Sequence, residues 1–151
     1  MSDSVSAHIC FGIALEEGDE LPWEKEGFSD ANDWWRHING YKASFEIFEN
    51  GNYIGGVKPA EDVIDRYYKE RREWEKAHPL PVEYWNAGSH SIPSYVLVVP
   101  QPQMICGRWE PSAFDPADLV VPAQALAAFE QFCQRFSVPG KASWQLCCFA
   151  P

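Results

Sequence analysis

Apolar and polar residues alternate along residues 5–14, which places Ile9 and Ile13 on one face of an expected strand. The other face, which carries His8 and Cys10, is also low in charge. A strand that is covered on both faces lies inside a sheet rather than at its surface. We therefore expect residues 5–14 to form a central strand.

Three segments have the apolar spacing and the end signals of helices. Residues 30–39 follow capping side chains and precede Gly40, which favours the left-handed conformation at a helix end. Residues 59–78 start with a proline and two acids, which suit the first turn of a helix. Residues 122–136 are amphipathic. The side chains expected to face inward are Ala60, Ile64, Tyr67, Arg71 and Trp74 in the second helix and Leu126, Phe129, Cys133 and Phe136 in the third.

A hairpin is predicted around Asn50 and Gly51, the residue pair that best fits a type I′ turn. Residues 41–48 alternate in hydrophobicity before the turn, and residues 52–54 would form the short return strand. Further strands are expected at 82–86, 94–99, 104–109 and 144–148.

Strands outnumber helices in this pattern and do not alternate regularly with them. The sequence therefore predicts a single α+β domain over residues 1–151. We expect a mostly antiparallel sheet of about five to six strands, together with two to three helices. The strand at 94–99 is continuously apolar and is expected to be buried on both faces.

Charge narrows the range of partners. The chain has 151 residues with 22 acids and 12 bases, so its formal net charge is −10. Binding to a phosphate backbone needs Lys and Arg to displace counterions, so direct nucleic-acid binding is not expected. Eight of the acids lie in residues 1–30. The acidic loop 16–30, with Leu21, Trp23 and Phe28 as apolar anchors, is long enough to be a candidate functional loop.

The cysteines and the N-terminus indicate the compartment. The chain has five cysteines and no C-x-x-C motif, so a disulfide framework is not expected. We expect the cysteines to be small, buried apolar residues of a protein in the reducing cytosol. No apolar run approaches the ~20 residues that span a bilayer, and the N-terminus has no secretory signal. We expect a cytoplasmic protein that does not bind membranes.

No motif for catalysis or for a cofactor is found. The pair Gly55-Gly56 belongs to no phosphate-binding loop pattern, and none of the four histidines has the spacing of zinc ligands. Ser and Cys nucleophiles lack an identifiable base and orienting acid. We therefore predict no catalytic residue, no metal and no cofactor, and an enzyme is less favoured than a binding protein.

Seven tryptophans are many for a chain of this size, and aromatic side chains are enriched where proteins bind one another. The expected binding residues lie next to the acidic loop and in the polar turn at 86–93; they are Trp23, Trp34, Trp35, Trp85, Asn86 and His90. The alternative is an aromatic core with partly exposed indoles. Trp35→Ala and Trp85→Ala distinguish the two: a binding surface predicts intact folding with lost binding, and a core predicts lost folding.

Three short segments resemble known sequences. Gly12-Ile13-Ala14-Leu15 with the acidic run, Leu21-Pro22-Trp23 and Trp34-Trp35 resemble the start of small uncharacterised proteins of tailed phages and prophages. Residues 142–149 resemble the short aromatic C-terminal strand of those proteins, and the His-containing turn before 95–99 is also similar. The resemblance implies a phage-encoded accessory protein, and it transfers no catalytic residue.

The sequence thus predicts a non-enzymatic cytosolic binding protein of phage or prophage origin that engages a host protein, for example to inhibit a host defence process. The alternative is a protein that binds or sequesters a small, nucleotide-like ligand. A small enzyme is the third possibility. A ligand binder would need a deep pocket with convergent polar groups, whereas a protein binder would need an exposed apolar patch with a polar rim.

Overall fold

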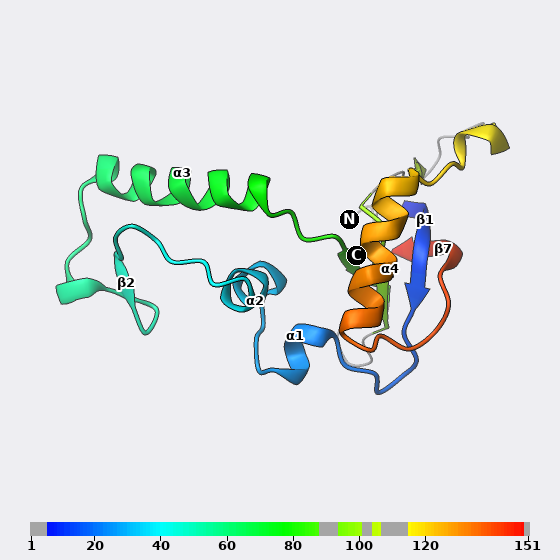
Figure 1. The fold of residues 1–151 in the computed structure, drawn as a ribbon, viewed down its shortest axis with the longest axis horizontal. Helices are drawn as coiled ribbons and strands as arrows, with labels where there is room; N and C mark the ends of the chain where they lie inside the picture. The colour runs from blue at the N-terminus through cyan, green and yellow to red at the C-terminus, as the bar shows by residue number, and fades with distance from the viewer. Residues whose placement is uncertain (1–5, 88–93, 101–103, 107–114, 150–151) are drawn as a thin grey trace, which may run out of the picture. The chain divides into compact units, whose positions relative to one another are not determined.

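The computed structural model describes residues 6–87, 94–100, 104–106 and 115–149 (Figure 1). The chain packs into two compact units, and each is described by itself. The first unit comprises 1–26 with 81–151, and the second comprises 27–80. The prediction of one domain over 1–151 stays a prediction.

The first unit contains an antiparallel sheet with β1 at its centre, as the alternation of residues 5–14 predicts. One edge of β1 pairs with β7, and the other edge pairs with β5 and then with β6; β4 extends the sheet beyond β5. The strands are β1 (Ser6–Ala14), β4 (Glu83–Asn86), β5 (Tyr95–Val98), β6 (Met104–Cys106) and β7 (Ser143–Phe149). The registers fix which side chains share a face: Ile9 lies opposite Leu146, and Gly12 lies opposite both Ser143 and Val98.

Both faces of the sheet are buried at its centre. Cys10 and Val98 lie on one face, Ile13 and Leu97 lie on the other, and all four side chains are buried. This confirms that the 94–99 strand is covered on both sides. A core on both faces stabilises the central strand far more than an edge position would.

Gly12 allows the close approach of β5 to β1. A Cβ atom at this position would lie 2.0 Å from the carbonyl oxygen of Leu97, a backbone atom that cannot move aside alone. Glycine is therefore required at position 12 because there is no room for a side chain between β1 and β5, and not because the backbone is left-handed there.

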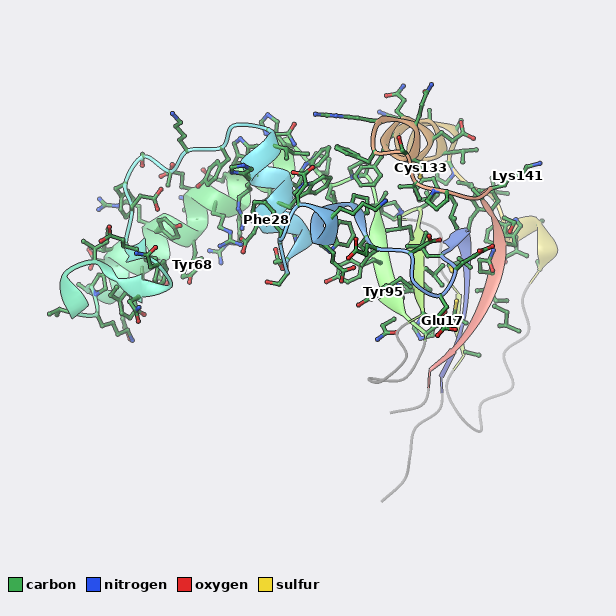
Figure 2. All side chains as sticks on the ribbon, turned by 90° about the horizontal axis from the view of Figure 1, so that it is seen from below. Glu17, Phe28, Tyr68, Tyr95, Cys133 and Lys141 are labelled. Atoms are coloured by element: carbon green, nitrogen blue, oxygen red, sulfur yellow. The ribbon has the colours of Figure 1, made fainter. Side chains whose placement is uncertain are left out.

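Helix α4 (Ala123–Arg135) lies against one face of the sheet of the first unit (Figures 1 and 2). It turns Phe129 and Phe132 into the interior, with Cys133 half-buried. The expected inward stripe is thus present, and Phe132 adds to it. The 3₁₀-helix η2 (Pro116–Asp118) precedes α4.

The acidic loop contains a short helix, α1 (Pro22–Lys25), where an unstructured loop is predicted. Leu21 and Trp23 are fully buried, which confirms them as apolar anchors. The helix forms because the carboxylate of Glu24 accepts the backbone N–H of Leu21 at 3.1 Å, and Pro22 suits the first helical position.

The second unit is built from two helices and a hairpin. Helix α2 (Ala31–Ile38) begins at Asp30, whose carboxylate accepts the backbone N–H of Asp33 at 2.8 Å, and it is followed by Gly40 at a φ of 68°. Both ends agree with the predicted capping. Helix α3 (Glu61–Ala77) ends before Pro79, as predicted, and none of its 17 side chains is fully buried.

The hairpin of β2 (Phe48–Glu49) and β3 (Asn52–Tyr53) confirms the predicted turn, because Asn50 and Gly51 both have positive φ values, 50° and 78°. A type I′ turn requires this conformation at both central residues.

The predicted strand over 41–48 is wrong except at Phe48. Residues 41–47 alternate between inward and outward side chains, but they run along α3 and are not assigned to a strand. The carbonyl oxygen of Ile47 accepts the backbone N–H of Ile54 at 3.0 Å, next to the hairpin. Tyr41 contacts the Trp74 ring, Ser44 donates its backbone N–H to Glu70 at 2.6 Å, and Phe45 contacts Tyr67. Every second side chain of this segment faces inward because the segment packs against helix α3, and not because it belongs to a sheet.

The α+β class with a mostly antiparallel sheet is confirmed. The described residues contain four α-helices rather than two to three, the additional one being α1. Residues 107–109 of the predicted 104–109 strand lie outside the described residues, as does residue 5 of the first strand. In the part of the chain that the structure describes, no helix combines the length and the apolar character needed to cross a membrane.

Candidate functional site

The predicted binding residues are divided between the two units. Trp23, Trp85 and Asn86 belong to the first unit, whereas Trp34 and Trp35 belong to the second. His90 lies outside the described residues.

Trp23 and Trp34 are core residues in this structure. Trp23 is 1% exposed and its ring lies 4.8 Å from that of Tyr84, and Trp34 is 0% exposed with its ring 6.0 Å from that of Trp35. Neither presents a surface to a partner. For these two residues the structure therefore favours the aromatic-core alternative.

Trp35 and Trp85 are half-buried and have structural contacts. The indole N–H of Trp35 donates to the carbonyl oxygen of His78 at 3.0 Å, which connects α2 to the end of α3. Trp85 packs edge-on against His8, with ring centroids 5.2 Å apart, above the core of Cys10 and Cys147. Each side chain is thus held by a packed cluster while part of it remains accessible to solvent.

Asn86 is exposed and is the last residue of β4. Its side-chain oxygen accepts the backbone N–H of Ser94 at 3.1 Å, and Ala87 donates its backbone N–H to the carbonyl oxygen of Ser94 at 2.8 Å. These two hydrogen bonds join the end of β4 to the residue that precedes β5, so Asn86 has a structural role in the sheet.

The thiols of Cys10 and Cys133 are unsuited to nucleophilic chemistry. Burial, with a smaller contribution from Cys147, raises the pKa of Cys10 to about 12, and burial raises the pKa of Cys133 to about 11. Only a thiolate is an effective nucleophile or metal ligand. Within the described residues, no three His, Cys, Asp or Glu side chains are grouped so that they could hold a metal ion.

The second unit contains a charged cluster that the sequence did not reveal. Arg36 is only 6% exposed, and its guanidinium forms ion pairs with Asp33 and Glu75. Arg71 binds the same two carboxylates, Glu75 at 3.2 Å and Asp33 at 3.3 Å. All four charges have partners, so the cluster joins α2 to α3 and leaves no group poised for chemistry.

Next to this cluster, Tyr41 stands out among the aromatic residues. Its ring packs on Trp74, which in turn stacks on His78 with centroids 4.4 Å apart. Its buried hydroxyl has no hydrogen-bond partner among the described residues. Burial, followed by the nearby carboxylate of Glu70, raises the pKa of Tyr41.

The second unit also exposes two apolar side chains next to the hairpin, Ile54 and Val57, which follow the half-buried rings of Phe48 and Tyr53. We call these four residues the apolar tip. Phe48 stacks on Tyr53, with centroids 5.0 Å apart, so these two rings form one surface. Ile54 is 48% exposed and Val57 is 73% exposed.

Two glycines explain why the apolar tip faces solvent. Gly55 and Gly56 have φ values of 74° and 71° and form, with Ile54, the 3₁₀-helix η1 (Ile54–Gly56). This turn stops β3 after two residues, so Ile54 and Val57 lie outside any sheet. The signal was present in the sequence, because two large apolar residues flank a Gly-Gly pair there, where a loop normally carries polar residues.

The chain matches no protein-family model, no curated protein and no solved structure. The resemblance to tailed-phage proteins therefore stays a prediction.

Proposed function

We propose that this is a non-enzymatic binding protein that engages a partner protein through the apolar tip. The observation that carries the proposal is the exposure of Ile54 and Val57 beside the stacked rings of Phe48 and Tyr53. Single exposed apolar residues are common, but here two large ones lie within four positions of each other, and they follow two half-buried aromatic rings. Exposed apolar patches and aromatic side chains are typical of interaction surfaces.

The surroundings of the apolar tip suit a protein partner. Exposed charged side chains of both signs flank it in the sequence, Glu49 on one side and Lys58 on the other. An apolar centre with a charged rim is the usual anatomy of a protein interface. The resemblance to phage accessory proteins favours a protein of a bacterial host as the partner, in the host cytoplasm, with inhibition of a host defence process as the expected consequence.

The proposal is tested by capture from lysates of bacterial hosts, followed by mass spectrometry of the retained proteins. The wild-type chain should retain a specific protein, and Val57→Asp should lose it because a carboxylate in the interface centre would be desolvated without a partner. Val120→Asp is the matched control, since Val120 is exposed to a similar extent, at 63%, in the first unit.

The expected result is retention by the wild type and by Val120→Asp, with loss in Val57→Asp. Equal retention by all three chains, or no retained protein at all, would contradict the proposal.

A further inference from the structure

One exposed stripe of α3 carries a pattern of charges that the single chain does not use. Residues spaced four, three, four and four apart lie on one side of a helix. The stripe consists of exposed residues, namely Glu61, Asp65, Tyr68, Arg72 and Lys76. The half-buried stripe of α3, including Tyr67 and Trp74, contacts residues 41–48 instead. Figure 2 labels Tyr68 on this helix.

The charges of the stripe are separated by sign. Both acids precede Tyr68 and both bases follow it. Within the described residues, none of these four charged side chains forms an ion pair, whereas their neighbours on α3 do: Lys69 pairs with Glu73 at 3.9 Å and Arg71 pairs with Glu75.

The helix dipole explains part of this arrangement but not all of it. An acid in the first turn and a base in the last turn are stabilised by the dipole, which accounts for Glu61 and Lys76. The effect of the dipole fades in the middle of the helix, and Asp65 and Arg72 lie there rather than in the terminal turns. Moreover, each of these two residues has a like charge four positions away, Glu61 or Lys76, and such a pair destabilises a lone helix by roughly a few tenths of a kcal/mol. Asp65 also has a favourably spaced base, Lys69, but that base pairs with Glu73.

We infer that the stripe binds a second copy of this chain, with the two α3 helices antiparallel about a two-fold axis beside Tyr68. The point halfway between Glu61 and Lys76 lies between residues 68 and 69, and the point halfway between Asp65 and Arg72 is the same. A two-fold axis at this point therefore relates each acid to the position of a base. Antiparallel packing therefore places each acid opposite a base of the second copy and the two Tyr68 rings together. A parallel pair would place like charges opposite each other, so the charge pattern selects the antiparallel, isologous dimer.

This inference does not rest on the proposed function, since the stripe and the apolar tip share no residue. The two surfaces are tested by different variants, and the failure of one leaves the other standing.

The test is sedimentation equilibrium of the full chain. The wild type should dimerise, and 1 M salt should weaken the dimer because exposed charges are then screened within about 3 Å. Asp65→Arg and Arg72→Asp should each raise the dimer dissociation constant about tenfold or more, because like charges then face each other twice in each dimer. Lys42→Asp is the control, an exposed charge reversal outside α3 that should leave the constant unchanged.

A mixture of the two single variants decides the question. In a heterodimer of Asp65→Arg with Arg72→Asp, every reversed position again faces the opposite sign, so the mixed sample should associate with the wild-type constant. The double variant Asp65→Arg/Arg72→Asp should likewise dimerise on its own. Such a rescue cannot arise from misfolded chains. A monomeric wild type, a dimer that tolerates both single reversals, or a mixture that does not associate would overturn the inference.

Discussion

At the scale of single residues, Gly12 is the most demanding position of the sheet. Gly12→Ala would place a methyl group against the Leu97 carbonyl. We expect the free energy of unfolding to fall by about 3 kcal/mol, the upper range for overpacking in a rigid core. Urea unfolding measures this.

The control is Gly18→Ala, where a Cβ meets no atom within 4 Å but the φ of 92° is strained. Its cost should be about 1 kcal/mol, from the backbone alone. Equal costs at the two positions would contradict the account of the β1–β5 approach.

A second prediction at this scale concerns pH. The pKa of Cys10 is about 12 in the folded chain, above its ordinary value of 9.0, because burial disfavours the thiolate. Above the ordinary value the unfolded chain ionises and the folded chain does not, so this stabilisation is complete below pH 9 and is lost as the pH rises toward 12.

The free energy of unfolding should therefore decline between pH 9 and 12, and Cys10→Ala should reduce the slope of that decline. Cys133 and Tyr41, whose pKa values are also raised, account for part of the remaining slope. An unchanged slope in Cys10→Ala, measured by urea unfolding at several pH values, would show that Cys10 is not buried as a thiol.

The tryptophans are also tested one residue at a time. Trp35→Ala removes the hydrogen bond to His78, and Trp85→Ala uncovers the core of the first unit. Each should cost about 2 kcal/mol or more, toward the lower end for core tryptophans because both are half-buried. Leu146→Ala, at a position 69% exposed, should change stability by less than about 0.5 kcal/mol. Unchanged stability in both tryptophan variants would favour the binding-surface prediction instead.

At the scale of helices and strands, the sequence predicted the features that depend on neighbouring residues, namely helix ends and a hairpin turn. Asp30 and Gly40 mark the ends of α2, and Asn50-Gly51 marks the hairpin, because each acts on its own neighbours. Residues 41–47 were misassigned because alternation reports which side chains face inward and not what covers them. The covering element is α3, whose Glu70 accepts the backbone N–H of Ser44.

The connection of α2 to α3 depends on Arg36. No sequence pattern identified this residue, because one of its carboxylate partners, Glu75, lies 39 positions away, although the other, Asp33, lies only 3 positions away. Arg36→Ala should destabilise the second unit by about 2 kcal/mol, because hydrogen bonds to charged groups are lost from a guanidinium that is nearly buried. Lys42→Ala, an exposed position, should cost less than about 0.5 kcal/mol. Loss of helical circular dichroism during urea unfolding measures both, and equal midpoints would contradict the role of the cluster.

At the scale of the whole molecule, the net charge is unevenly divided. The first unit has 12 acids and 4 bases, whereas the second has 10 acids and 8 bases. The sequence located this acidity in residues 1–30, but it could not reveal that the second unit is close to neutral, because the division into units depends on packing.

The candidate site, like the division of charge between the units, could be predicted only in part. Counting aromatic residues predicted a binding surface of tryptophans, yet Trp23 and Trp34 are buried, whereas the aliphatic residues Ile54 and Val57 are exposed. Burial is decided by contacts between distant segments, so composition does not show which apolar side chains face solvent.

The most direct test of the central claim is amide hydrogen exchange of the chain with and without its captured partner. Binding through the apolar tip predicts slower exchange at residues 52–57, with residues 83–86 and 143–147 unchanged. Protection at Trp35 and Trp85 without any change at 52–57 would contradict the claim and return the binding site to the tryptophans.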